Sequence, residues 1–210
     1  MKISNLSRRS GVSVATIKFY LREHLLPPGV PTARNQAEYD ETHVARLRLI
    51  RVLTGMGMMS LASVREVLAA LDDNCMSPHG LAKVVNNALS AEHPPRSDVP
   101  ADTSASTQVD RFLSDLGWRV DPNTPGRATL AQVLVALRDL GWDCDVDIFA
   151  PCADAAERLA VRELDSLPTD GAATAVARTV LLEVAFAVMR RMAYEHYLAI
   201  RAHGSAAPDR

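Results

Sequence analysis

The side chains that could do chemistry near the start of the chain are cationic and aromatic, and their spacing suits one face of a short helix. Lys18 and Arg22 are four residues apart, with Phe19 between them. Since a helix turns once in about 3.6 residues, both cations share a face, while Ile17 lies in a separate apolar stripe. Lysine and arginine can donate to guanine edges and phosphates, and an aromatic ring can contact thymine methyls. The pattern predicts a helix that binds the major groove of DNA.

Two short helices around a tight turn are expected to position this face. Ser4 can cap a first helix that ends near Ser10, and Gly11 supplies the backbone freedom of a sharp turn. Ser13 can cap the second helix through the amides two and three residues further on. Prolines and a glycine within residues 25–29 then stop that helix and turn the chain.

Further short elements follow this helix pair. Residues 30–39 predict a small two-stranded wing with Arg34 at its tip. Asp40 can cap a third helix, and Ser60 can cap a fourth. The third helix carries three arginines that are expected to face outwards, not all of which can face DNA: Arg46, Arg48 and Arg51.

The rest of the chain shows helical periodicity and no strand-like alternation. The expected fold is therefore mainly α, with an N-terminal winged helix-turn-helix domain followed by an all-helical C-terminal domain. Helices are expected at 78–91, 109–118, 129–140, 148–164 and 171–202. The proposed domains are a DNA-binding domain at 1–71, a short connecting or dimerising helix at 72–92, a proline-containing linker at 93–106, and an effector-binding or dimerising domain at 107–204.

Charge is distributed unevenly along the 210 residues. Residues 1–70 hold ten Lys and Arg against five Asp and Glu, whereas the remainder holds thirteen against twenty. A surface that binds phosphates is therefore expected in the N-terminal third.

Composition also indicates the cellular compartment in which the protein functions. Three cysteines are too few for a disulfide-stapled secreted domain, and residues 1–10 are polar and basic, without a following apolar signal region. The most apolar run, 180–189, contains Glu183 and is too short to span a bilayer. A soluble cytoplasmic protein without a membrane partner is expected. No catalytic motif is present, so we expect no enzyme.

The run from Thr16 to Pro28, TIKFYLREHLLPP, resembles the MerR family of bacterial transcription regulators, in which this helix reads close to TIRYYER followed by a Gly-Leu-Leu turn. The resemblance continues through the wing and the next two helices, over residues 1–71. It implies a winged helix-turn-helix that binds pseudo-palindromic promoter DNA as a dimer and acts on RNA polymerase indirectly, by distorting the promoter. The residues expected to bind DNA are Val14, Ala15, Thr16, Lys18, Phe19, Tyr20 and Arg22 in the second helix, with Arg34 and Asn35 in the wing. Tyr20 is equally compatible with a place in the core.

The chain departs from the family pattern at several points. Leu21 replaces the usual glutamate, and the wing has Gln-Ala-Glu at 36–38 where Gly-Tyr-Arg is usual. The helix at 78–91 is shorter than the dimerising helix of the family, so part of the dimer interface is expected in the C-terminal domain. That domain resembles the sensor half of TetR-type regulators, which implies a small-molecule effector.

Two sites for an effector are conceivable. Residues that could line a ligand pocket, but could equally pack at helix ends or on a polar helix face, are Trp118, Trp142, Glu183, Tyr194 and Tyr197. An alternative function is thiol-based metal or redox sensing by Cys144 and Cys152, with Cys75 as a further candidate ligand. Isolated intracellular cysteines more often fill apolar space, and the pair lacks zinc-ligand spacing. No cofactor is expected.

Overall fold

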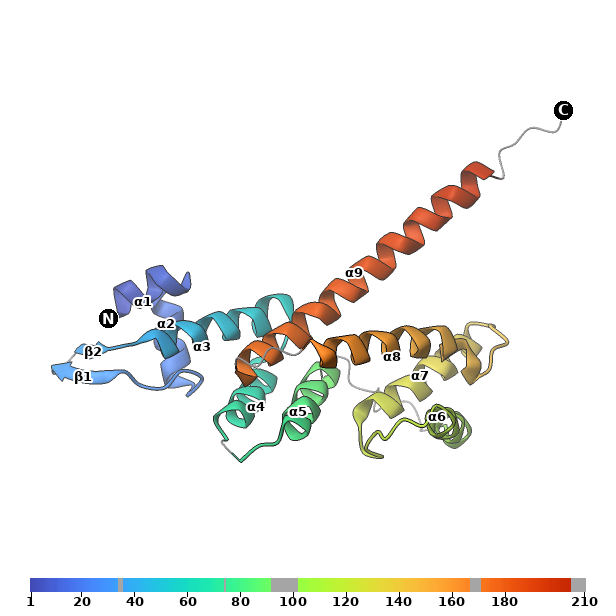
Figure 1. The fold of residues 1–210 in the computed structure, drawn as a ribbon, viewed down its shortest axis with the longest axis horizontal. Helices are drawn as coiled ribbons and strands as arrows, with labels where there is room; N and C mark the ends of the chain where they lie inside the picture. The colour runs from blue at the N-terminus through green and yellow to red at the C-terminus, as the bar shows by residue number, and fades with distance from the viewer. Residues whose placement is uncertain (34–35, 74, 92–101, 167–170, 205–210) are drawn as a thin grey trace. The chain divides into compact units, whose positions relative to one another are not determined.

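The computed structural model describes residues 1–33, 36–73, 75–91, 102–166 and 171–204 (Figure 1). Contacts divide the chain into two units. The first unit comprises Met1–Leu68 together with Ala172–Arg210, and the second comprises Ala69–Gly171. The C-terminal helix thus groups with the N-terminal unit, whereas the sequence predicted one domain over 107–204.

The first unit begins with the predicted helix pair and wing. Its elements are α1 (Ile3–Ser10), α2 (Val14–Arg22), β1 (Val30–Ala33), β2 (Gln36–Glu38), α3 (Glu41–Arg51), the π-helical turn η1 (Val52–Met56), most of α4 (Leu61–Asp72) and α9 (Ala172–Gly204). Lys2, not Ser4, is the N-cap of α1, so the predicted serine cap was wrong. Gly11 ends α1 with a φ of 69°, a left-handed conformation that costs glycine little.

A compact apolar core holds these short helices together. Leu6, Ile17, Leu25, Leu47 and Ile50 are fully buried. These side chains come from α1, α2, the turn after α2 and α3, so the helix pair closes onto the third helix. Truncating a buried leucine to alanine typically costs about 2–5 kcal/mol, and a domain this small depends on each of these contacts.

The third helix predicted after Asp40 does not keep a regular α-helical form to its end. It changes after Arg51 into the π-helical turn η1, against which the N-terminal part of α9 packs. Val176 and Val180 of α9 are buried there. A Cβ on Gly57 would lie 2.7 Å from Val180 Cγ1 and 2.7 Å from the Leu53 carbonyl oxygen. The close approach of α9 therefore requires a residue without a side chain at this position.

The second unit is helical in its described residues. Its elements are α5 (Pro78–Ala91), α6 (Thr103–Asp115), α7 (Pro125–Asp139), the 3-10 helix η2 (Val146–Phe149) and α8 (Ala150–Asp165). Asp102 caps α6 by accepting from the amides of Ser104 and Ala105, so the last four residues of the predicted linker 93–106 are helical. A core forms between α6 and α7 around Val109, Leu113 and Leu134.

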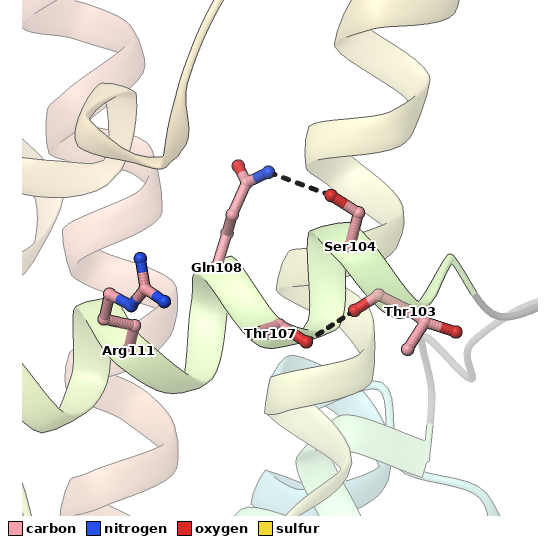
Figure 2. A pocket seen from close by; sticks show the side chains of 5 residues that line it. All are labelled: Thr103, Ser104, Thr107, Gln108 and Arg111. Atoms are coloured by element: carbon pink, nitrogen blue, oxygen red, sulfur yellow. Dashed lines mark hydrogen bonds between the residues drawn. The ribbon is translucent and has the colours of Figure 1, made fainter.

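Polar contacts surround this core. Arg127 donates to Asp110 at 2.5 Å and to the Val120 carbonyl oxygen at 2.9 Å. The Lys83 ammonium pairs with Asp121, and this contact holds the pKa of the Asp121 carboxyl below its usual range. A hollow of about 350 Å³ runs along a polar face of α6 (Figure 2). It is lined by Thr103, Ser104, Thr107, Gln108 and Arg111.

One helix passes a length and composition test for membrane spanning. The segment Ala172–Arg201 of α9 has a mean hydropathy of 1.7 in its most apolar window, and 11% of that window is buried. The sequence had predicted only a short apolar run at 180–189. A single such helix is weak support for a membrane span.

Candidate DNA-binding surface

The second helix of the pair is fixed by its cap and by its apolar back. Ser13 Oγ accepts from the Thr16 amide at 3.1 Å, which confirms the predicted cap. Ile17 is fully buried, and Tyr20 is only 8% exposed. Tyr20 thus belongs to the core of the first unit. Its carbonyl oxygen also accepts from the amides of Leu25 and Leu26, which closes the turn after α2.

The opposite side of α2 is open. Lys18 and Arg22 are both exposed, and among the described residues neither makes a hydrogen bond or an ion pair. Ala15 beside them is exposed too. The remaining candidates on this helix are half-buried: Val14, Thr16 and Phe19. The structure therefore gathers two unneutralised cations on one face, with small and apolar groups next to them.

Of the three arginines of α3 that were expected to face outwards, Arg48 and Arg51 are exposed and Arg46 is half-buried, and all three also reach the helix pair. Arg46 Nε donates to the Leu25 carbonyl oxygen at 2.6 Å, and Arg51 Nη1 donates to the Ser10 carbonyl oxygen at 3.0 Å. Arg48 Nη2 lies 3.4 Å from the Arg9 carbonyl oxygen. Carbonyls at helix ends lack partners within their own helix, so cations there are stabilising. These guanidinium groups bind the ends of α1 and α2 to α3 rather than simply facing outwards.

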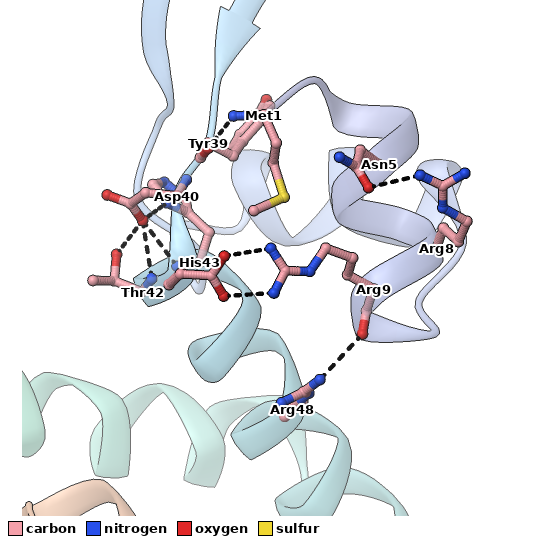
Figure 3. Close-up of polar contacts among 10 residues, drawn as sticks. Met1, Asn5, Arg8, Arg9, Tyr39, Asp40, Thr42, His43 and Arg48 are labelled. Atoms are coloured by element: carbon pink, nitrogen blue, oxygen red, sulfur yellow. Dashed lines mark hydrogen bonds and ion pairs between the residues drawn. The ribbon is translucent and has the colours of Figure 1, made fainter.

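A second set of polar contacts joins α1 to the start of α3 (Figure 3). Arg9 forms a two-pronged contact with Glu41, with Nη2 2.8 Å from Oε2. Asp40 caps α3 by accepting from the amides of Thr42 and His43. Hydrogen bonds from the Thr42 hydroxyl and the His43 ring hold the pKa of the Asp40 carboxyl well below its usual range. The entry to α3 is therefore built around a charged carboxylate.

The predicted wing is present as an antiparallel pair. Val30 of β1 pairs with Glu38 of β2, and the register slips between Pro31 and Ala33. The base of the wing is close-packed, because a Cβ on Gly29 would lie 2.6 Å from the Glu38 carbonyl oxygen. The two wing candidates lie outside the described residues: Arg34 and Asn35.

The backbone conformation of the turn after α2 was not predicted from the sequence. His24 has a φ of 57°, in the left-handed region. It occupies the place where the MerR pattern has glycine, so the deviation from Gly-Leu-Leu was a usable signal for a strained backbone.

The structure does not bring the predicted effector residues together in one pocket. Trp118 packs against the core of the second unit, whereas Trp142 is 60% exposed. The other three lie on α9 and are exposed: Glu183, Tyr194 and Tyr197. None of them lines the hollow on α6 or a second hollow of about 190 Å³ beside α5, both of which are formed mainly by polar residues of the second unit.

The cysteines likewise do not form a metal centre in the described part of the chain. Cys144 packs against the core of the second unit, and its carbonyl oxygen accepts from Arg138 Nε at 3.0 Å. Cys152 and Cys75 are exposed. Among the described residues, no group of three or more His, Cys, Asp or Glu is arranged to hold a metal ion.

A helix pair with an open cationic face, a buried back and a two-stranded wing defines a winged helix-turn-helix protein. A family model described as the MerR HTH family regulatory protein matches residues 1–71. Over 96% of its length the chain is also similar to SCO5550 of Streptomyces coelicolor A3(2), a protein assigned as a transcriptional regulator, at 36% identity and a TM-score of 0.69; the match covers 97% of that protein. This chain belongs to the MerR family of transcription regulators.

Two further relatives match less of the molecule. The HTH-type transcriptional regulator ZntR homolog of Haemophilus influenzae is 34% identical over 68 residues, which is 32% of this chain. The chain matches half the length of this curated relative. The lead(II)-bound PbrR691 of Ralstonia metallidurans CH34 is 26% identical, with 59% of this chain and 91% of that chain covered; its TM-score of 0.40 supports no structural argument. The family consists of transcription regulators, which confirms that the chain is not an enzyme.

Proposed function

We propose that this protein is a sequence-specific DNA-binding regulator that acts as a dimer on a pseudo-palindromic promoter site. In each copy, α2 enters a major groove and the wing contacts the flanking phosphates. The observation that carries the proposal is the exposed, unpaired state of Lys18 and Arg22 on a helix whose other side is buried. Because both cations are exposed, they remain available to pair with phosphates and base edges when DNA binds.

The other cations of the first unit support the same assignment. Arg46 and Arg51 are engaged by carbonyl oxygens of the helix pair, and Arg9 is engaged by Glu41. They hold α2 in place, so Lys18 and Arg22 meet the DNA on a rigid support. A rigid support matters because base recognition depends on the placement of individual donors.

We propose that the second unit modulates the regulator by binding an effector that acts on the dimer. The residues that would bind this effector are not assigned. A bound effector would have to favour one of two dimer states to change promoter geometry, and through it the action of RNA polymerase. The site of action is the cytoplasm, where the promoter DNA is.

The proposal is tested with the double variant Lys18→Ala, Arg22→Ala on a duplex selected by the wild-type protein from a random pool. Each base contact contributes about 1–3 kcal/mol, so binding should weaken at least about tenfold. Arg111→Ala is the matched control, since Arg111 lies on α6, is also exposed and has no partner among the residues that the structure describes. Undiminished binding by the double variant would refute the assignment of α2.

A salt titration tests the phosphate contacts separately. The logarithm of the binding constant should fall steeply with the logarithm of salt concentration, with a slope of about −0.9 for each neutralised phosphate. A binding constant that does not change with salt concentration would contradict contacts of the wing and the helix pair with DNA phosphates.

A further inference from the structure

The hollow beside α5, here called the α5 hollow, lies between one face of that helix and the loop that joins α6 to α7. The loop contributes Arg119 and Asp121 to its lining. The other side of α5 packs into the second unit, where Val85 and Ala88 are buried. The polar side chains of α5 that line the hollow follow the spacing of a single helix face: His79, Lys83, Asn86 and Asn87.

Hydrogen bonds within the loop hold the walls of the α5 hollow in place. The Asp121 carbonyl oxygen accepts from the Thr124 amide at 3.0 Å and from Arg127 Nε at 3.2 Å. Arg127 also donates to the Val120 carbonyl oxygen at 2.9 Å. Lys83 ties the loop to α5, because its ammonium group pairs with the Asp121 carboxylate. Walls that are held together without a ligand reduce the entropic cost of binding one.

Donors outnumber free acceptors around the α5 hollow. Both carboxylate oxygens of Asp121 are in use, since Oδ2 accepts from Lys83 and Oδ1 accepts from the Asn123 amide at 2.8 Å. Arg119, Asn86 and Asn87 make no hydrogen bond or ion pair with the residues that the structure describes. The guanidinium group therefore lacks an anion there, and the two side-chain amides can still donate and accept. A ligand with one anionic group and several hydroxyl groups would satisfy this set.

The unit around the α5 hollow is acidic, so a cationic hollow stands out in it. Residues 69–171 hold eight Lys and Arg against seventeen Asp and Glu. Among the charged residues that line the hollow the balance is reversed, because Lys83 and Arg119 stand against Asp121. The acidic surroundings repel nucleic acids and other polyanions. Since Asp121 already neutralises Lys83, the hollow suits a small ligand with a single negative charge.

We infer that the α5 hollow binds a small monocarboxylate that carries hydroxyl groups, and that this ligand is the effector of the second unit. The inference deepens the proposed function and rests on it for the effect on DNA, but not for the binding itself. Arg119 holds the carboxylate through its planar pair of donors. Asn86, Asn87 and His79 hydrogen-bond the hydroxyl groups.

The volume of the α5 hollow limits the size of this ligand. About 190 Å³ is the space of about six water molecules in the liquid, which suits a ligand of roughly six to ten non-hydrogen atoms. Pockets for drug-sized molecules are larger, at about 300–1,000 Å³. The ligand is therefore a short-chain hydroxy acid rather than a large aromatic compound.

The α5 helix follows the helix that both units share. The division between the units falls between Leu68 and Ala69, which lies inside α4. The next helix along the chain is α5, which begins at Pro78. A carboxylate bound on α5 thus acts close in the chain to the shared helix. It changes DNA binding if it binds two arrangements of that helix with different affinities.

Calorimetric titration of the full-length protein tests the class of ligand. The hydroxycarboxylates are lactate, glycerate and 3-hydroxybutyrate. Glycerol has the hydroxyl groups of glycerate without the charge, and propanoate has the charge of lactate without the hydroxyl group. At least one hydroxycarboxylate is expected to bind about tenfold more tightly than glycerol or propanoate. Absence of binding by all three at millimolar concentration, or equal binding of glycerol, would overturn the inference.

Inorganic phosphate and glycerol 3-phosphate separate carboxylate recognition from phosphate recognition. Both carry more negative charge than the single unpaired guanidinium group can neutralise, so they are expected to bind more weakly than the hydroxycarboxylate. Tighter binding of either phosphate would overturn the assignment of a carboxylate.

Substitutions locate the ligand in the α5 hollow. Arg119→Gln should weaken binding of the hydroxycarboxylate at least about tenfold, because a charged donor is lost. Asn87→Asp, which keeps the shape of the side chain and adds a negative charge, should weaken it by a similar factor. The matched control is Arg111→Gln, since Arg111 is exposed, has no partner among the described residues and lines the hollow on α6 (Figure 2). Loss of binding in the control but not in Arg119→Gln would place the ligand on α6 and overturn the inference.

The effect on DNA is measured separately, after circular dichroism has shown that each variant keeps its helices. A saturating hydroxycarboxylate is expected to change the affinity of the wild type for its selected duplex at least about fivefold, and to leave that of Arg119→Gln unchanged. Unchanged affinity in the wild type would overturn the role of the ligand as the effector. Failure of the proposed function has a different signature, namely a protein that binds the hydroxycarboxylate but no DNA.

Discussion

At the level of single residues, the acceptors near each cation of the first unit determine whether that cation supports the fold or stays available to bind DNA. Arg46 and Arg51 reach the carbonyl oxygens of Leu25, just after α2, and Ser10, at the end of α1, and these hydrogen bonds engage both guanidinium groups in holding the helix pair to α3. Lys18 and Arg22 find no such acceptor among the described residues. The sequence alone does not separate these four cations, and only their surroundings show which ones support the fold and which remain open to DNA.

His24 is the clearest case of residue-level strain. A φ of 57° at a residue with a side chain is disfavoured, and glycine relieves it. His24→Gly is expected to raise the free energy of unfolding by about 0.5–1 kcal/mol, after the greater freedom of glycine in the unfolded chain is allowed for. Urea denaturation measures this.

Lys18→Gly, within α2, is the control variant for the effect of His24→Gly on the free energy of unfolding. It should lower the free energy of unfolding by about 1 kcal/mol, since glycine is a poor helix former. If both glycine variants destabilise equally, the strain at position 24 is not real.

The Asp40 cap gives the unit a specific acid sensitivity. Its pKa is lowered in the folded protein from the ordinary value of 3.8, so its contribution to stability is present above that value and is lost as pH falls towards the folded pKa. Asp40→Asn, which keeps a capping oxygen but loses the charge, should be less stable than wild type at pH 6. The difference should shrink steadily below about pH 4. Thermal unfolding from pH 6 to pH 3 tests this, and a difference independent of pH would contradict the carboxylate's role.

At the level of elements, local signals located most helices and capping residues. Ser13, Asp40 and Ser60 each accept from the amides expected of a cap, because capping depends only on neighbouring residues. The errors arose where local preference is weak. The linker was extended over Thr103–Ser106, although Asp102 caps a helix there, and α3 was not expected to end in the π-helical turn η1.

The contact between η1 and α9 can be tested by substitution of Gly57. Gly57→Ala would place a methyl group 2.7 Å from Val180 Cγ1 and from the Leu53 carbonyl oxygen. Overpacking of this kind costs about 1–3 kcal/mol, so thermal stability should fall and amide exchange in the first turns of α9 should accelerate. Gly55→Ala is the matched control, because a Cβ there meets no atom within 4 Å. Equal effects from both substitutions would show that α9 does not depend on this contact.

At the level of the whole molecule, the sequence could place α9 as a long helix but could not say which unit it joins. Periodicity reveals that a helix has an apolar side, and it carries no information on which neighbour covers it. Val176 and Val180 were therefore assigned to a C-terminal domain, whereas they pack within the first unit. The same limit applies to Trp118 and Cys144. Their residue types permit ligand or metal chemistry, and burial against the core of the second unit accounts for both instead.

The proposed dimer makes DNA affinity depend on the number of half-sites in the duplex. If two copies bind together, the α2 helix of the second copy engages its half-site at a high effective concentration. The wild-type protein should then bind a complete two-fold site about 100-fold or more tightly than an isolated half-site. Fluorescence anisotropy on duplexes carrying one or two half-sites measures both values. The double variant Lys18→Ala, Arg22→Ala should lose affinity for both duplexes, because it changes the same helix in each copy. Equal affinity of the wild type for the two duplexes would show that the protein binds DNA through one copy at a time.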